Sequence, residues 1–398
     1  MPARRRSLRL ILLTWAVIIL LVGVWLGGHP EDLPSFARSL FVADHQTRVV
    51  DEAINRIASD YYRPVGKRRL ADASIAGAVA SLGDRFSHYL TAKEYAEFNQ
   101  PPRFTGIGVS VDPSRNGLLI ARVFDASPAA RARLQAGDVI VSVGRRKLAG
   151  LTAEAAATLI KGPPGTDVVL GVSERRGPRT YVRTLRITRA LISEPVVDSE
   201  MRSVRGRKLG VIALASFSPG AHGEVSEAVQ NDLRRGARGF VFDLRANGGG
   251  LVEEARLTAS IFLAKGTIVT TRGRNQPTQT LTAVGHPLAG ALPLVVLVDS
   301  NTASASEIVA AALQDHNRAT VVGTHTFGKG VFQEEQPLTN GGALDITVGE
   351  YFTPNGRNLG GGGVKQGAGI APQVLVPSGV DSVHGLRVAL NTLAAKVR

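Results

Sequence analysis

The sequence contains no cysteine, which excludes disulfide bonds, cysteine nucleophiles and thiolate metal sites. Its 8 histidines show neither H-x-x-x-H nor H-E-x-x-H spacing, and the phosphate-loop pattern G-x-x-x-x-G-K-S/T is absent. Aromatic residues make up only 5% of the chain and no basic stripe carries interleaved aromatics, so the net charge of +14 does not indicate a nucleic-acid partner. We therefore expect no metal, no cofactor and no nucleic acid.

An apolar run occupies residues 10–28, where Thr14 is the only polar side chain, and four arginines precede it. A helix of this length spans about 28 Å, close to the thickness of a bilayer core of about 30 Å. Positive charge before the run holds the N-terminus in the cytoplasm. We expect residues 1–28 to form an uncleaved transmembrane anchor, with the rest of the chain in the periplasm or at the cell exterior. A cleaved signal peptide is the alternative.

The length of 398 residues suits two or three domains. After the anchor, the patterns predict a helical region at 29–100, a compact domain of short strands at 101–188, a core at 189–380 and a C-terminal helix at 381–398. Within the core and tail, strand candidates are 209–213, 239–244, 267–271, 292–299, 320–322 and 344–351, and helix candidates are 223–235, 251–262, 304–314 and 382–396. This alternation predicts a mixed α/β fold, in which helices cover a sheet.

Ser304 follows the apolar strand candidate 292–299 and opens the helix candidate 304–314. A strand-to-helix turn presents a serine at the sheet edge, near free N–H groups that can stabilise an oxyanion. Ser304 and Glu307 also have the S-x-x-E spacing of a capping box, so a purely structural cap is the alternative. The two interpretations are compatible, because a cap position is where a nucleophile would meet the helical amides.

Lys329 stands between two glycines in the segment T-F-G-K-G at residues 326–330. A lysine has an ordinary pKa of about 10.4, so it acts as a base only if desolvation lowers that pKa. We expect Phe327, beside the flexible glycines, to place Lys329 in an apolar pocket. A solvated loop lysine is the alternative.

Residues 243–250, D-L-R-A-N-G-G-G, offer backbone N–H groups at a strand end, and their glycines permit close approach to a substrate. An ordinary tight turn is the alternative. For the serine, the rival chemistry is a Ser-His-Asp triad. However, no G-x-S-x-G elbow occurs, and no matching acid motif accompanies His88, His316 or His325.

Together these segments resemble the carboxy-terminal processing peptidases, the serine–lysine proteases related to tail-specific protease. The family pattern S-A-S-A-S-E is similar to T-A-S-A-S-E at residues 302–307, and T-F-G-K-G matches letter for letter. The resemblance implies that Ser304 is the nucleophile and Lys329 its general base. It also implies that Gln333, four residues after the lysine, orients the amine.

The family's D-L-R-x-N-x-G-G pattern resembles residues 243–250. The resemblance implies oxyanion amides from Gly249 and Ala305, with Gly250 as the alternative to Gly249. It further implies a crotonase- or Clp-protease-like β-α core into which a second domain is inserted.

That second domain, at 101–188, resembles a PDZ domain. Residues Gly106, Ile107, Gly108 and Val109 resemble the loop that receives a C-terminal carboxylate through backbone N–H groups, and a peptide would pair with the following strand. Lys161 stands where the family often carries an arginine that couples the PDZ domain to the active site. A lysine keeps the charge but lacks the bidentate fork, so we expect a regulatory role with altered coupling.

The resulting hypothesis is a serine endopeptidase that cleaves proteins near their C-terminus by an acyl-enzyme mechanism. Its PDZ domain would capture unstructured C-terminal tails of substrate proteins, and its N-terminal helix would hold it at the membrane. A homodimer or an adaptor protein is left open. The alternatives are a non-catalytic PDZ scaffold on a degenerate protease core and a crotonase-like acyl-CoA enzyme.

Overall fold

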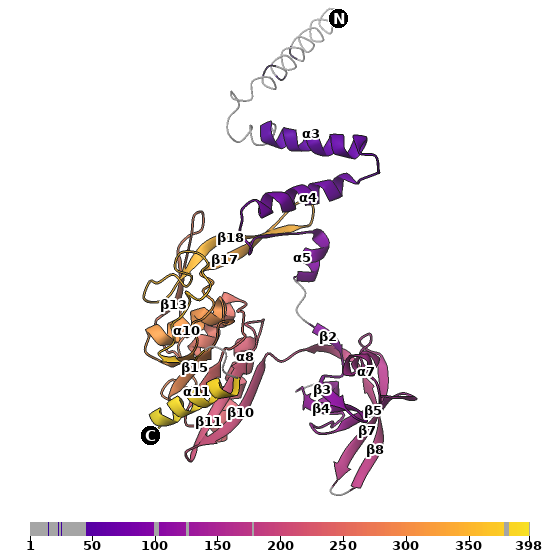
Figure 1. Cartoon of the computed structure of the whole chain (residues 1–398), viewed down its shortest axis with the longest axis vertical. Helices are drawn as coiled ribbons and strands as arrows, with labels where there is room; N and C mark the ends of the chain where they lie inside the picture. Colours follow the sequence, from indigo (N-terminus) through magenta and orange to yellow (C-terminus); the bar gives the residue numbers. More distant parts are fainter. Residues whose placement is uncertain are drawn as a thin grey trace, which may run out of the picture. The chain divides into compact units, whose positions relative to one another are not determined.

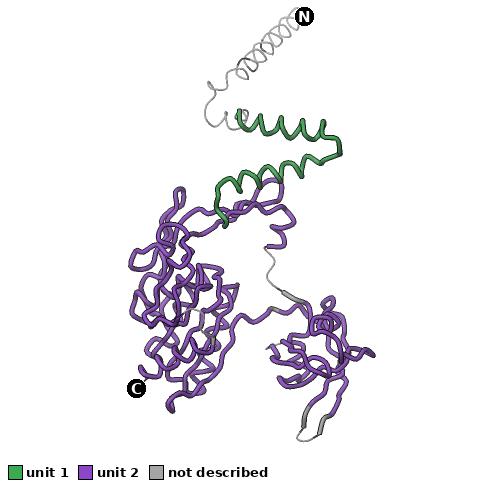
Figure 2. The backbone as a smooth tube through the Cα atoms, in the orientation of Figure 1, with its two compact units in different colours: residues 1–85 green, residues 86–398 purple. Residues whose placement is uncertain are grey.

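The computed structural model describes residues 45–98, 103–124, 127–176, 179–377 and 382–397, together with Trp15, Gly23 and Trp25. Apart from those three single residues, the expected anchor at 1–28 lies outside the described part of the chain. Among the described residues, no helix has both the length and the apolar character needed to cross a membrane. The chain divides into two compact units, residues 1–85 and residues 86–398 (Figure 2).

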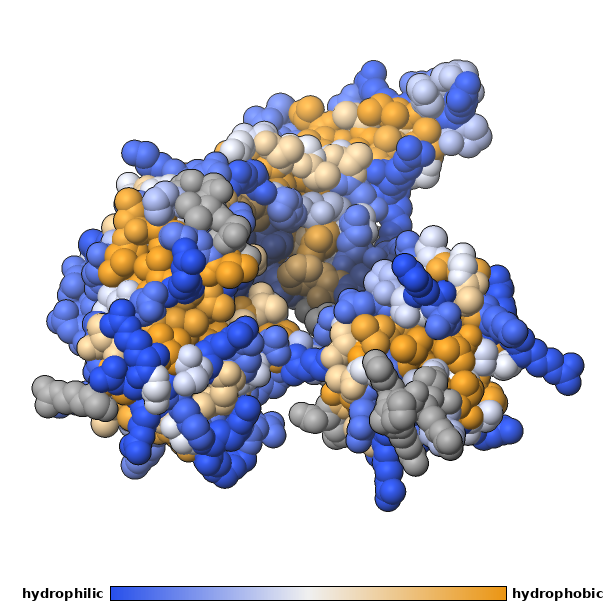
Figure 3. Space-filling model, turned by 60° about the horizontal axis from the view of Figure 1, so that its bottom comes forward, coloured by the Kyte–Doolittle hydropathy of each residue, from blue (hydrophilic) through white to orange (hydrophobic). Residues whose placement is uncertain are grey.

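Residues 45–85 of the first unit form the helices α3 (His45–Asp60) and α4 (Lys67–Ala80), in the region where the apolar spacing predicts helices. No residue of α3 is buried, and Val49, Val50 and Ile57 are about half exposed. Apolar patches also interrupt the hydrophilic residues over the face of the molecule shown in Figure 3. The helix α4 ends at a turn in which Gly83 has a φ of +66°, a backbone conformation that glycine adopts readily.

The second unit includes a small β-rich domain, the one expected to be a PDZ domain. Its sheet has the order β3-β4-β5-β7-β8, with β6 paired to β5. The bounds are β3 Val109–Ser114, β4 Gly117–Val123, α6 Pro128–Arg131, β5 Val139–Val143, β6 Arg146–Lys147, α7 Ala153–Ile160, β7 Asp167–Arg176 and β8 Arg179–Thr188. The strands β2 (Arg103–Gly106) and β9 (Ala190–Ser193) pair antiparallel, so the chain enters and leaves this domain side by side.

The chain does not run as one strand through the segment from Gly106 to Val109. The structure ends β2 at Gly106 and begins β3 at Val109, because Gly108 adopts a φ of +82°. A Cβ at Gly108 would lie 2.3 Å from the Cβ of Ser127, so only glycine fits this close approach.

The centre of the second unit is a six-stranded sheet in the order β10-β11-β12-β15-β16-β19. Only β10 and β11 pair antiparallel; the other neighbours are parallel. The bounds are β10 Val197–Val204, β11 Arg207–Leu214, β12 Phe240–Asp243, β15 Leu294–Val298, β16 Thr320–Gly323 and β19 Val374–Leu375. Because parallel strands end at the same edge, the segments that follow β12, β15 and β16 meet there.

Helices cover both faces of this sheet (Figure 1), which confirms the predicted mixed α/β fold. Their bounds are α8 Ala221–Arg234, α9 Val252–Ser260, α10 Ala305–Asp315 and α11 Ser382–Lys396. Phe240 and Phe242 of β12 share a core with α8, α9 and α10, whereas Val241 lies in a separate core with α11. All of β15 is buried, as its unbroken apolar run predicts.

A second, antiparallel sheet has the path β1-β18-β13-β14, with β17 paired to β18. The bounds are β1 His88–Leu90, α5 Ala92–Phe98 beside it, β13 Thr267–Gly273, β14 Gln279–Thr282, β17 Val331–Pro337 and β18 Ala343–Phe352. The strand β17 begins two residues after Lys329. The lysine segment therefore connects β16 of the first sheet to β17 of this second sheet.

Candidate active site

Ser304 connects β15 to α10 in a strained conformation. It has φ of +56° and ψ of −118°, and it is only 8% exposed. A non-glycine residue rarely adopts such a φ, and strain of this kind collects at functional sites. A Cβ at Gly249 would lie 2.9 Å from the Cβ of Ser304 and 3.0 Å from the N of Ala305. The glycine turn after β12 therefore lies directly against the serine and the first residue of α10.

Glu307 fastens the serine and the lysine segment to one carboxylate. Its Oε2 accepts hydrogen bonds from the backbone N–H groups of Ser304 and Lys329, both at 2.9 Å. Its Oε1 accepts from the Thr326 hydroxyl at 2.5 Å and from the Gly328 N–H at 2.7 Å. Burial raises the pKa of Glu307, and these four donors act in the opposite direction. The Glu307 side chain thus does more than cap the start of α10. It also joins Ser304 and Lys329, which lie 25 positions apart in the sequence.

Replacing Glu307 with glutamine should lower the free energy of unfolding by about 2 kcal/mol, since the new amide group would face N–H donors that lose their acceptor. Denaturant unfolding of the purified variant measures this change. Glu253→Gln is the matched control, because Glu253 lies in the first turn of α9 but pairs with Arg256 at a largely exposed position. Equal stability of the two variants would contradict the role of the buried carboxylate.

The amine of Lys329 contacts an amide oxygen and an aromatic ring. Its Nζ donates to Oε1 of Gln333 at 2.7 Å and lies 4.6 Å from the centroid of the Phe86 ring. Gln333 is fixed in turn, because its Nε2 donates to the Thr347 hydroxyl at 2.8 Å. The sequence singles out Phe327 as the aromatic neighbour, and the structure adds the ring of Phe86 beside the amine. No sequence signal links Phe86 to the lysine, since more than 200 residues separate them.

The two amides expected to stabilise an oxyanion differ in their surroundings. The N–H of Gly249 donates to Oδ1 of its neighbour Asn247 at 2.9 Å, and Nδ2 of Asn247 donates to the Leu214 carbonyl at 2.8 Å. Ala305 is fully buried and is the first residue of α10, where backbone N–H groups have no partner within the helix. The Gly249 amide is therefore already engaged by an internal acceptor, which the sequence pattern did not indicate.

The histidines of the rival triad lie elsewhere. His316 bonds through Nε2 to the Thr267 carbonyl at 2.7 Å, and His325 and His88 are exposed. Within the described part of the chain, no histidine hydrogen-bonds Ser304, whose backbone N–H is held by Glu307.

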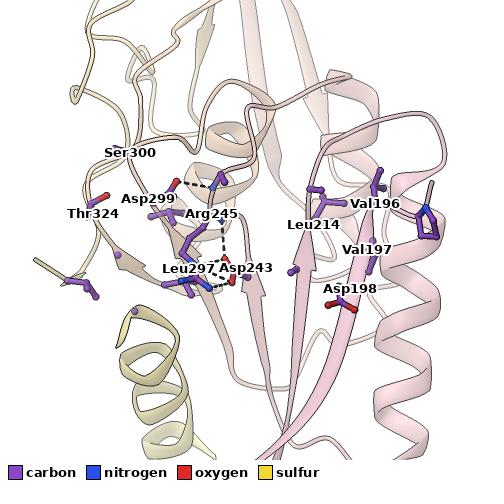
Figure 4. Close-up of a pocket in the computed structure, with 18 of the residues that line it drawn as sticks. Val196, Val197, Asp198, Leu214, Asp243, Arg245, Leu297, Asp299, Ser300 and Thr324 are labelled. Carbon is purple, nitrogen blue, oxygen red and sulfur yellow. Dashed lines mark hydrogen bonds and ion pairs between the residues drawn. The ribbon is translucent and has the colours of Figure 1, made fainter. Parts of the chain in front are cut away.

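A cavity of about 580 Å³ opens at the carboxyl ends of the parallel strands (Figure 4). Arg245 pairs there with Asp243, its Nη2 lying 2.5 Å from Oδ2, and Asp299 accepts the N–H of Ala246 at 3.0 Å (Figure 4). Asp299 also accepts the N–H of Thr302. Neither Ser304 nor Lys329 lines this cavity. Its polar groups instead secure the two turns that lead to the glycine segment and to the serine.

The loop expected to bind a peptide carboxylate, Gly106 to Val109, lies between β2 and β3 in the small β domain. Ile107 is buried, and its carbonyl accepts the N–H of Ala129 at 2.8 Å. Lys161 follows α7 as an exposed residue whose amine has no ion-pair partner among the described residues. Among the described residues, neither the loop from Gly106 to Val109 nor Lys161 forms a hydrogen bond or an ion pair with Ser304.

Comparison with known proteins gives matches over most of the chain. Residues 208–375 match the model of peptidase family S41, and residues 96–173 match that of the PDZ domain. The chain is 31% identical over 372 residues to the carboxy-terminal-processing protease of Bartonella bacilliformis, covering 90% of this chain and 82% of that protein. It is also 31% identical over 365 residues to the carboxy-terminal processing protease CtpA of Bacillus subtilis, covering 91% and 76%.

Solved structures agree with this result. The photosystem II D1 C-terminal processing protease has a TM-score of 0.51 and 26% identity, covering 87% of this chain and 98% of that chain. A putative S41 protease from Bacteroides fragilis has a TM-score of 0.50 and 20% identity, covering 88% and 98%, and shows a similar fold.

Proposed function

Because the chain belongs to the carboxy-terminal processing proteases of peptidase family S41 and is a protease, we propose that its nucleophile is Ser304 and its general base is Lys329. The observation that carries this proposal is the shared carboxylate of Glu307, which binds the backbones of both residues. The strained serine and the lysine held by Gln333 support it further. A serine needs an adjacent base to become a nucleophile, and Lys329 is the base that we propose.

In the proposed reaction, the uncharged Nζ of Lys329 takes the proton of the Ser304 hydroxyl while Oγ attacks the peptide carbonyl carbon. Gln333 accepts one N–H of the amine, which leaves the nitrogen lone pair for the proton. The carbonyl oxygen becomes an oxyanion that the amides of Ala305 and Gly249 stabilise. For this step Gly249 exchanges the Asn247 oxygen for the substrate oxygen.

The tetrahedral intermediate then collapses, and Lys329 returns the proton to the leaving amine. Water, activated by the same lysine, hydrolyses the acyl-enzyme and restores Ser304. No metal or cofactor takes part in these steps. We propose that the core is a crotonase- or Clp-protease-like β-α fold and that the PDZ domain is inserted into it.

We further propose that the substrates are proteins with unstructured C-terminal tails. The PDZ match, with the loop from Gly106 to Val109, supports capture of a terminal carboxylate and β-strand pairing of the tail. Lys161 is proposed to couple this domain to the core. The arginine-flanked apolar run at 10–28 supports a membrane anchor with the protease outside the cytoplasm. A homodimer or an adaptor is compatible with this proposal.

The test is covalent labelling by a fluorophosphonate, with the site of attachment mapped by mass spectrometry. We expect Ser304 to carry the label and the labelling rate to rise from about pH 5 to about pH 9, because a lysine must be uncharged to act as a base. A flat profile would argue against Lys329 as the base. Absence of labelling together with retained binding of tail peptides would support the non-catalytic PDZ scaffold instead.

A further inference from the structure

A second serine of the T-A-S-A-S-E segment, Ser306, lies two residues after the proposed nucleophile. It is the second residue of α10, and it is fully buried. Its hydroxyl donates a hydrogen bond to the backbone carbonyl of Asn247 at 2.9 Å. Asn247 stands two residues before Gly249 in the turn that follows β12. Ser306 therefore bonds the start of α10 to the glycine turn through its side chain.

The surroundings of Ser306 do not suit a nucleophile. No part of the residue is exposed, whereas Ser304 is 8% exposed. The hydroxyl of Ser306 donates its hydrogen to a backbone carbonyl, and a carbonyl oxygen does not take up a proton as a general base would. What this hydroxyl can do is hold the group that it contacts.

Asn247 carries the bond from Ser306 on to the proposed oxyanion amide. Its carbonyl accepts the hydroxyl of Ser306 and also the N–H of Ala303, the latter at 3.0 Å. Its side chain accepts the N–H of Gly249 at Oδ1 and donates from Nδ2 to the carbonyl of Leu214. Asn247 is itself fully buried. A displacement of Asn247 would therefore displace the amide of Gly249.

The two bonds to the Asn247 carbonyl come from opposite sides of the proposed nucleophile. Ala303 precedes it and donates from its backbone, and Ser306 follows it and donates from its side chain. One bond alone would let the glycine turn pivot about it, whereas two bonds from different residues fix the orientation of the turn. A pivot would matter here, because a Cβ at Gly249 would lie only 3.0 Å from the N of Ala305.

We propose that Ser306 is a positioning residue, whose hydroxyl sets the place of the Gly249 amide relative to the amide of Ala305. This inference rests on the proposed function, in which those two amides stabilise the oxyanion. Donors of this kind must be in place before the reaction, since an error of about 1 Å in the position of a group can lower the rate by about a hundredfold. Ser306 does not touch the substrate and acts through Asn247.

Replacing Ser306 with alanine should lower kcat for a tail substrate by about tenfold, with little change in KM, because only the transition state uses the oxyanion amides. Alanine is a good helix former, so α10 should persist. Steady-state cleavage measures the effect, and denaturant unfolding measures the stability. Ser260→Ala is the matched control, because Ser260 is buried in α9 and its hydroxyl also donates to a backbone carbonyl, that of Arg256, at 2.7 Å. The control should keep its kcat.

A pair of inhibitors separates the oxyanion amides from general packing. The first is a peptide aldehyde that ends at the mapped cleavage position of the tail substrate, and its adduct with the nucleophile places an oxygen where the oxyanion forms. The second is the same peptide as an amide, which forms no adduct and reports ground-state binding. We expect Ser306→Ala to raise the inhibition constant of the aldehyde by about tenfold and to leave that of the amide unchanged.

The ratio of the two inhibition constants decides the inference even if Ser306→Ala loses stability, because both constants are measured on the same folded protein. A ratio equal to that of the native enzyme, or equal kcat in Ser306→Ala and Ser260→Ala, would overturn the positioning role. Neither result would touch the proposed function, because loss of cleavage and of labelling in Ser304→Ala decides that question independently.

Discussion

Replacing Ser304 with alanine should lower kcat/KM for a tail substrate by about 10⁴-fold or more, to the level left by substrate binding and the oxyanion amides alone. Alanine keeps the Cβ of the residue and adds no atoms, so the strained turn and the Glu307 contact to its backbone remain. The measurement is cleavage of a purified protein whose flexible tail ends in a free carboxylate. Denaturant unfolding should show a fold of nearly native stability.

Ser300→Ala is the control for that experiment. Ser300 lies four residues earlier on the same connection but is exposed and lines only the cavity next to the site. It should keep full activity. Substantial proteolysis by the Ser304 variant in a preparation free of other proteases would mean that another residue is the nucleophile.

Replacing Lys329 with methionine should lower kcat/KM by about 10³-fold or more, because the serine loses its proton acceptor while keeping its position. Methionine retains the length of the chain and makes favourable contacts with an aromatic ring such as that of Phe86. The loss should therefore appear in kcat and in the rate of labelling at Ser304, and it should persist at alkaline pH. Peptide binding to the PDZ domain should be unchanged.

Lys365→Met is the control for the lysine. Lys365 is exposed, and its backbone N–H bonds to Gly328 within the same loop system, so the variant changes charge without touching the amine of Lys329. A Lys329→Met enzyme that still cleaves and still labels with a rising pH profile would assign the base to another group.

The sequence predicts the elements with strong periodicity or an unbroken apolar run well. The helix predicted at 382–396 coincides with α11, and the buried strand predicted at 292–299 contains β15. The strand β17 has no such signal, because its residues F-Q-E-E-Q are mostly polar and their pairing with β18 supplies the order. The turn at Gly108 between β2 and β3 could not be predicted for a different reason, because it depends on the close approach of Ser127 from a later segment.

The site shows the same division. Motif resemblance pointed to Ser304, Lys329 and Gln333, and the last two are hydrogen-bonded in the structure. The approach of Phe86 to Lys329 joins residues that lie far apart in the sequence, and no local pattern encodes it. Motif spacing also does not predict that the backbone N–H of Gly249 donates to the side chain of Asn247.

The carboxylate of Glu307 has a consequence for protein engineering. A designer who copied only a serine and a lysine onto a new scaffold would omit the group that binds the backbones of both segments. Four donors from two chain segments converge on that one side chain, and each must arrive at the correct distance. The smallest portable version of this site is therefore a helix start and a loop with a buried carboxyl group between them, and not a pair of residues.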